Sequence, residues 1–115
     1  MSELVREIGG ADFEQEVLNS TEPVLVDFWA AWCAPCRMIQ PTLETLAREY
    51  EATARIVKVD VDNEQSLSQR YGIKALPTLV LFKGGKEEER IVGAANRETF
   101  ARLIDKHVST AKTAA

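Results

Sequence analysis

The stretch VLVDFWAAWCAPCRMIQP, residues 24–41, decides the fold because a strand, a short loop and the start of a helix follow one another in it. Its first part is β-branched and aromatic with apolar residues on both faces, which predicts a buried strand. Its second part begins an apolar stripe at helical spacing, and we expect Pro41 to kink that helix because proline lacks an N–H donor. The chain's two cysteines, Cys33 and Cys36, lie at the junction. Their spacing alone fits a metal half-site, a structural staple or a reaction centre.

The rest of the chain alternates between strand and helix patterns separated by caps and turn residues. We predict strands at 4–8, 23–30, 54–61, 78–82 and 88–93, and helices at 11–19, 35–51, 64–71 and from 96 onward. Asn63 or Asp62 is the expected N-cap of the third helix, and Gly72 its stop. This order predicts an α/β fold with a central five-stranded mixed sheet and four flanking helices on its two faces. We expect residues 1–108 to form a single domain and 109–115 to be a short, frayed tail.

Composition narrows the function. The 115 residues are 45% apolar and 28% charged, which is ordinary for a globular protein. The net charge of -4, with no cluster of Lys and Arg, argues against nucleic-acid binding. The N-terminus lacks a signal-peptide pattern and no apolar run approaches the roughly 18–20 residues of a membrane span, so we expect a cytoplasmic protein without membrane contact. In that reducing compartment a lone cysteine pair is catalytic or metal-binding rather than a staple.

The position of the cysteines favours redox chemistry. Cys33 lies where a strand ends and a helix begins, and the partial positive charge of a helix N-terminus stabilises a thiolate and lowers the thiol pKa. Cys36 lies one turn later on the same face, where it can close a disulfide with Cys33 and resolve a mixed disulfide. The alternative is zinc, which usually takes four ligands, and the chain offers no second cysteine pair and one histidine, His107.

Two charged residues interrupt apolar strands. Asp27 is the single charge in VLVDFW; if its strand is central, the carboxyl group is buried, its pKa is raised, and it can act as a general base beside the thiols. The alternative is an edge-strand aspartate that faces water. Lys58 interrupts IVKVDV and could pair with Asp27 across neighbouring strands, or could lay its stem on the sheet and reach water.

Four other residues can be assigned roles from the sequence around them. Pro77 precedes an apolar strand, where a trans proline is common. Trp29 lies on the strand and is expected in the core, whereas Trp32 directly precedes Cys33 and could screen the sulfur or touch a partner. His107 fits a surface position in the last helical turn, where a cation favours the helix dipole.

Together these residues resemble the thioredoxin family over about residues 4–108. VLVDFWAAWCAPCRMIQP resembles the family's strand, active-site loop and kinked helix, and KVDVDNEQSLSQRYGIKALPTLVLFKGG resembles its second half. The resemblance implies the thioredoxin fold, with Cys33 as the exposed nucleophile and Cys36 as the resolving thiol. It also implies that Asp27 accepts the Cys36 proton with Lys58 nearby, and that Pro77 is cis in a loop packed against the disulfide. The implied apolar substrate-contact surface consists of Trp32, Ala34, Pro35, Leu76, Val92, Gly93 and Ala94.

The family also implies an activity and partners. A thioredoxin is a general protein-disulfide reductase that binds no cofactor or metal, pairs with extended substrate segments through the backbone of Leu76, and acts as a monomer. Its electrons come from NADPH through a separate flavoprotein thioredoxin reductase. Ala34, Ala75 and Arg37 replace the family's usual glycine, glycine and lysine, so the redox potential and partner range are where this chain is expected to differ from the family. A net oxidant or isomerase and a redox-independent binding subunit are the competing hypotheses.

Overall fold

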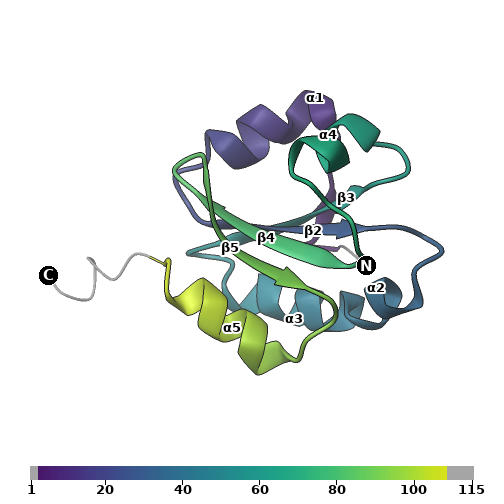
Figure 1. Ribbon diagram of the computed structural model, residues 1–115. Helices are drawn as coiled ribbons and strands as arrows, with labels where there is room; N and C mark the ends of the chain where they lie inside the picture. Colours follow the sequence, from purple (N-terminus) through teal and green to yellow (C-terminus); the bar gives the residue numbers. More distant parts are fainter. Residues whose placement is uncertain (1–2, 109–115) are drawn as a thin grey trace, which may run out of the picture.

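The computed structural model describes residues 3–108, which form a five-stranded mixed sheet with helices on both faces (Figure 1). The strand order is β1-β3-β2-β4-β5. In chain order the elements are β1 (Arg6–Glu7), α1 (Gly10–Phe13), η1 (Glu14–Leu18), β2 (Val24–Trp29), α2 (Ala34–Met38), α3 (Gln40–Glu49), β3 (Arg55–Asp60), α4 (Gln65–Arg70), β4 (Thr78–Lys83), β5 (Lys86–Val92) and α5 (Arg97–Asp105). The tail predicted at 109–115 lies outside the described residues.

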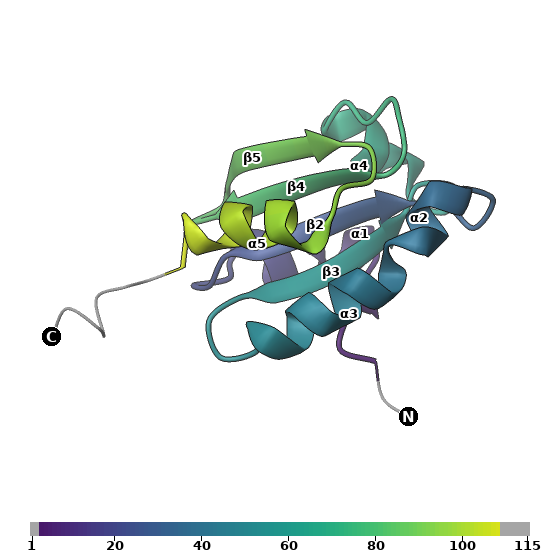
Figure 2. The same cartoon turned by 90° about the horizontal axis from the view of Figure 1, so that it is seen from below.

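The strand β2 is the centre of the sheet. It pairs in parallel with β3 and antiparallel with β4, so the predicted mixed sheet is confirmed. The helices α1 and α4 cover one face, and α2, α3 and α5 cover the other (Figure 1). Figure 2 shows this second group of helices in front of the strands. A strand with neighbours on both edges and helices on both faces is shielded from water; the first five residues of β2 are buried and Trp29 at its end is half-buried, which explains the apolar run.

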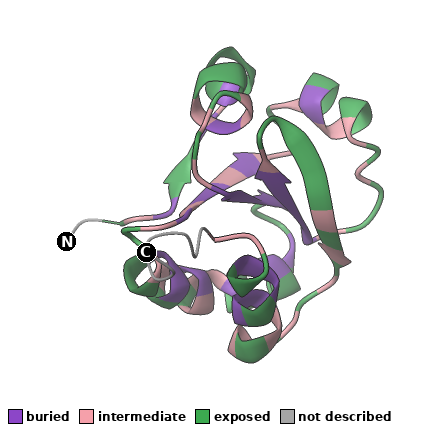
Figure 3. Ribbon diagram, turned by 90° about the vertical axis from the view of Figure 1, so that its left-hand side faces the viewer, coloured by how far each residue is buried: buried purple, intermediate pink, exposed green. Residues whose placement is uncertain are grey.

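Alternate side chains of β2 enter two separate hydrophobic cores. Leu25 packs on the α3 and α5 side, where Leu46 and Phe100 are also buried. Val26 points to the other face and packs in the cluster that contains Phe13. Figure 3 shows the central strands buried while much of the outer helix surface is exposed. Burial of each large apolar side chain contributes about 1.5–3 kcal/mol, so both cores hold β2 in a fixed register.

Two helices of the structure differ in form from the helices that the sequence predicts. The helix predicted at 35–51 divides at Ile39 into α2 and α3, and Pro41 lies in the first turn of α3. The predicted kink is therefore confirmed, since a proline without an N–H donor fits a first turn but not a helix interior. The helix predicted at 11–19 consists of α1 and the π-helical segment η1, where the N–H of Asn19 donates to the carbonyl five residues earlier at 2.8 Å.

The N-cap predicted for α4 is wrong. Glu64 holds that position without a side-chain cap bond, and its carboxylate accepts from a backbone N–H of α1 instead. The side chains of the two expected residues make other hydrogen bonds. The Asp62 carboxylate accepts from Nε1 of Trp32 at 2.9 Å, and the Asn63 side chain donates to Asp60 at 3.3 Å.

A two-glycine turn joins β4 to β5. Gly84 and Gly85 have φ values of 61° and 79°, which a type I′ turn requires and glycine adopts without strain. The hairpin returns the chain so that Val92 lies opposite Thr78. It thereby brings the end of β5 next to the loop that precedes β4, and both segments contribute to the site described below.

Candidate active site

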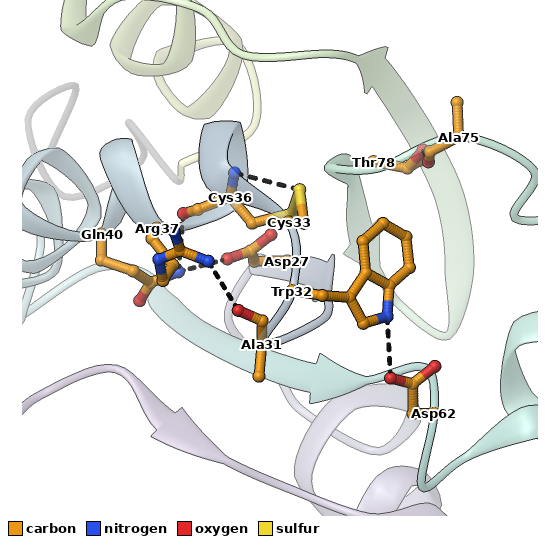
Figure 4. The surroundings of a disulfide bond; sticks show 10 residues. All are labelled: Asp27, Ala31, Trp32, Cys33, Cys36, Arg37, Gln40, Asp62, Ala75 and Thr78. Atoms are coloured by element: carbon orange, nitrogen blue, oxygen red, sulfur yellow. Dashed lines mark hydrogen bonds between the residues drawn. A yellow bond between two sulfur atoms is a disulfide. The ribbon is translucent and has the colours of Figure 1, made fainter.

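The two cysteines form a disulfide at the end of β2 (Figure 4). Cys33 is the N-cap of α2, and its sulfur accepts a hydrogen bond from the N–H of Cys36 at 3.2 Å. Cys33 is only 4% exposed and Cys36 is fully buried, so the expectation of an exposed first cysteine is corrected. The neighbouring loop and helix cover most of the pair. The small exposed fraction nevertheless belongs to Cys33, because it is the cysteine at the start of the helix.

Asp27 is fully buried on β2, which rules out the water-facing alternative. It shares a face of the strand with Leu25 and therefore points to the side covered by α2 and α3. Its Oδ2 accepts a hydrogen bond from Nε2 of Gln40 at 2.8 Å (Figure 4). Burial raises the pKa of Asp27 to about 7, while the Gln40 hydrogen bond and the charge of Lys58 act to lower it. This carboxyl group can therefore exchange a proton near neutral pH.

Lys58 lies beside Asp27 in the sheet. The two residues are register partners across the parallel β2–β3 pair. Among the ion pairs of residues 3–108, none joins them; the Lys58 ammonium instead lies 4.8 Å from the ring centroid of Trp29. The half-buried lysine therefore acts on Asp27 through its charge without forming an ion pair with it, and its ammonium lies against an aromatic ring. Trp29 is half-buried rather than fully in the core.

The loop before β4 forms the second wall of the site. The Leu76–Pro77 peptide bond is cis, as the resemblance implied. The side chain of Leu76 packs against the cluster that contains the cysteines. The carbonyl of Pro77 accepts from the N–H of Gly93 at 2.7 Å, and the Thr78 hydroxyl donates to the carbonyl of Ala75 at 2.6 Å. The loop before β4 therefore packs against the cysteines and is joined by a hydrogen bond to the residue that follows β5.

Exposed apolar residues surround this site. Among the described residues, the large apolar side chains that are exposed are Trp32 at 68%, Met38 at 76% and Val92 at 61%. The other predicted contact residues are also accessible: Ala34, Pro35 and Ala94 are exposed, and Leu76 and Gly93 are half-buried. A groove of about 610 Å³ is lined by Pro35, Met38, Ile39, Thr42, Ala94, Ala95 and Asn96. The disulfide thus lies within an apolar surface that a protein partner could cover.

Sequence reasoning missed two residues of the site. Gln40 lies four residues after Cys36, so helical spacing could have placed both on one face. Met38 lies off the buried stripe of its helix, which could have marked it as an exposed apolar residue. His107 was predicted at the surface and is half-buried: its Nε2 lies 2.8 Å from the carboxylate of Glu89 and its side chain is 17% exposed. It lies two residues beyond Asp105, the last residue of α5.

Two further features bear on the kind of site. Within residues 3–108, no group of three or more His, Cys, Asp or Glu side chains is arranged to hold a metal ion. No helix in this part of the chain has the length and apolar character needed to cross a membrane.

Known proteins are similar to this sequence over most of its length. The thioredoxin family model matches residues 4–106. A thioredoxin of Pyropia yezoensis is 42% identical over 105 residues, which cover 91% of this chain and 98% of that protein. Thioredoxin 1 of Synechococcus elongatus is 47% identical over 98 residues, covering 85% and 92%. The chloroplastic thioredoxin M5 of Oryza sativa is 43% identical over 112 residues, covering 95% of this chain and 65% of that protein.

A cysteine pair that forms a disulfide at a helix start, with a buried carboxyl group on the neighbouring strand and a cis-proline loop beside it, is suited to exchanging disulfides with other molecules. The chain belongs to the thioredoxin family. It has the thioredoxin fold and is a thiol–disulfide oxidoreductase whose redox-active pair is Cys33 and Cys36.

Proposed function

We propose that this oxidoreductase works as a general reductant of protein disulfides, with Cys33 as the attacking thiol and Cys36 as the resolving thiol. One observation carries the assignment of roles. The sulfur of Cys33 accepts the backbone N–H at the start of α2, whereas Cys36 is fully buried. A thiolate on Cys33 would keep that hydrogen bond and gain from the helix dipole, while Cys36 is shielded from a substrate.

The reaction proceeds in two exchanges. The Cys33 thiolate attacks one sulfur of the substrate disulfide; a new S–S bond forms, the substrate S–S bond breaks, and the first substrate thiolate leaves and takes up a proton. The Cys36 thiol then gives its proton to a base, and its thiolate attacks the Cys33 sulfur; the Cys33–Cys36 bond forms, the mixed disulfide bond breaks, and the second substrate thiolate leaves and takes up a proton. The substrate gains two electrons and two protons, and Cys33 and Cys36 end as a disulfide.

Asp27 is the proposed proton acceptor for Cys36. The carboxyl group is fully buried, and its pKa of about 7 lets both protonation states exist near neutral pH. The charge of Lys58 favours the ionised state that can accept a proton. Oδ1 of Asp27 has no hydrogen-bond partner among the described residues, so its capacity to accept is unused.

The substrate-contact surface supports broad specificity. Trp32, Pro35, Val92 and Ala94 are exposed around the disulfide, and contacts with apolar side chains require little sequence specificity. We propose that an extended substrate segment pairs with the backbone of Leu76, next to the cis-Pro77 loop. Ala34 and Gly93 would complete the surface.

The proposed partners follow the family pattern. The protein acts as a monomer on disulfide-containing proteins and binds no cofactor, and a separate flavoprotein thioredoxin reductase returns electrons to it from NADPH. It works in the cytoplasm, where the dithiol form can be maintained.

Trapping of intermediates tests these roles. The Cys36→Ser variant should accumulate a mixed disulfide with a disulfide-containing protein through Cys33, whereas Cys33→Ser should not. Mass spectrometry of the trapped species identifies the bonded cysteine, and trapping only through Cys36 would reverse the assignment. Consumption of NADPH that requires both a thioredoxin reductase and this protein tests the electron path. Reduced, folded protein that leaves an accessible disulfide intact would refute the proposed reductase.

A further inference from the structure

The side chain of Gln40 joins the buried carboxyl group to the backbone of the second cysteine. Its Nε2 lies 2.8 Å from Oδ2 of Asp27 and 3.4 Å from the carbonyl oxygen of Cys36. An amide nitrogen carries two hydrogens, so one can be donated to each acceptor. These contacts place Asp27 and the Cys36 backbone within about two hydrogen-bond lengths of each other.

The chain holds Gln40 in this position for identifiable reasons. It is the first residue of α3, directly after the break at Ile39, and it lies one helical turn beyond Cys36. Pro41 follows it and fixes the start of α3. The side chain is half-buried and reaches from the helix surface to the central strand (Figure 4).

The other groups that face Asp27 cannot orient it. Lys58 on β3 acts through its charge, and no ion pair within residues 3–108 joins the two. Leu79, its register partner on β4, is apolar. Gln40 is thus the side chain in the described part of the chain that hydrogen-bonds the carboxyl group, and it does so at Oδ2 while Oδ1 has no partner. A donor at one oxygen favours the ionised carboxylate and restricts its rotation.

We propose that Gln40 is a positioning residue for the resolving step: it holds Asp27 by Oδ2 and thereby keeps Oδ1 available to accept the Cys36 proton. The inference rests on the proposed role of Asp27 as proton acceptor. In that step the S–H bond of Cys36 breaks and an O–H bond forms at Oδ1. The electron pair stays on the Cys36 sulfur, which then attacks Cys33 and releases the substrate thiolate.

Two variants of Gln40, which should shift the pKa of Asp27 in opposite directions, test the proposal. Gln40→Leu keeps the approximate size but removes the donor, whereas Gln40→Lys keeps a donor and adds a positive charge. The control is Gln69→Leu, the same replacement at an exposed position of α4. In the oxidised protein, the ¹³C shift of the Asp27 carboxyl group is followed against pH. We expect a higher Asp27 pKa in Gln40→Leu, a lower one in Gln40→Lys, and no change in the control.

The rate of the resolving step is measured with a chromogenic aryl disulfide and the reduced protein. The first aryl thiolate leaves when Cys33 attacks, and the second leaves when Cys36 resolves the mixed disulfide. In Gln40→Leu the second release should slow about threefold to tenfold near neutral pH and recover in alkaline buffer, because loss of a hydrogen bond to a charged group reduces the ionised fraction of Asp27. The first release should keep its wild-type rate.

Each outcome decides between the alternatives. A wild-type Asp27 titration in Gln40→Leu overturns the proposal, and so does a slower second release whose pH profile is unchanged, because that pattern indicates packing alone. If Gln40→Leu does not fold, Gln40→Ala removes the same amide and is measured in the same way. Failure of the proposed function is separate: an Asp27→Asn variant with a wild-type pH profile for the second release would show that Asp27 is not the acceptor.

Discussion

Replacement of Asp27 by asparagine should remove the pH dependence that this buried group gives to the free energy of unfolding. Burial raises the pKa of Asp27 to about 7 from its usual value of 3.8, which the group regains on unfolding. Between these values the folded protein keeps a proton that the unfolded chain has lost, so the free energy of unfolding falls as pH rises. Above pH 7 both states are ionised and the loss is complete.

The size of the effect follows from the difference between the two pKa values. One pKa unit corresponds to about 1.36 kcal/mol, so ionisation of the buried group costs about 4 kcal/mol at alkaline pH. The amide side chain of the variant would not titrate and would not carry this cost. The stability of Asp27→Asn relative to wild type should therefore rise by about 4 kcal/mol between about pH 4 and pH 9. Any fixed cost of burying the amide cancels in this difference.

Urea unfolding of the oxidised proteins measures the effect across this pH range. Asp12→Asn is the matched control, because Asp12 is an exposed aspartate of α1 and its replacement should leave the pH dependence unchanged. A stability difference between Asp27→Asn and wild type that stays constant with pH would refute the reasoning, since it would mean that burial does not raise the pKa of Asp27.

Three other predictions concern residues around the site and the fold. Lys58→Met should raise the pKa of Asp27 further and lower stability at alkaline pH by roughly 1–2 kcal/mol, which the same carboxyl titration and urea series measure. Glu44→Leu should cost about 2 kcal/mol in urea unfolding, because the Glu44 carboxylate accepts from the N–H groups of Leu4 and Val5 at 2.9 Å each. Ala34→Gly should move the reduction potential by less than about 30 mV on equilibration with glutathione, because Ala34 is exposed outside the buried sulfur pair; a larger shift would make this position the main control of the potential.

The element order and the central strand were predictable from local pattern. The run VLVDFW is apolar on both faces, and a strand of that kind must have neighbours and covering helices on both sides. Pro41 predicted the break between α2 and α3, because its missing N–H removes a hydrogen bond to a residue one helical turn earlier, which is a local effect. The N-cap of α4 was not predictable, since the Asp62 carboxylate is engaged by Trp32, thirty positions earlier in the chain.

The cysteine pair was the part of the site that the sequence located by itself. Cys33 and Cys36 are three positions apart on a helix start, so their proximity is a local property. The extent to which Cys33 is covered was not local, and the expectation of an exposed sulfur was wrong. The contact between His107 and Glu89 was likewise missed, because the residues after α5 meet β5 only in the folded chain.

The sequence by itself therefore determined which groups are available: two thiols at a helix start, one carboxyl group in an apolar strand, and a proline before another strand. Only the tertiary structure decided what those groups do to one another. Asp27 has a raised pKa because neighbouring strands and helices exclude water from both faces of β2, and its hydrogen bond comes from Gln40 across the strand–helix interface. Burial and through-space contacts depend on the packing of distant segments, whereas strand and helix patterns depend on neighbours along the chain.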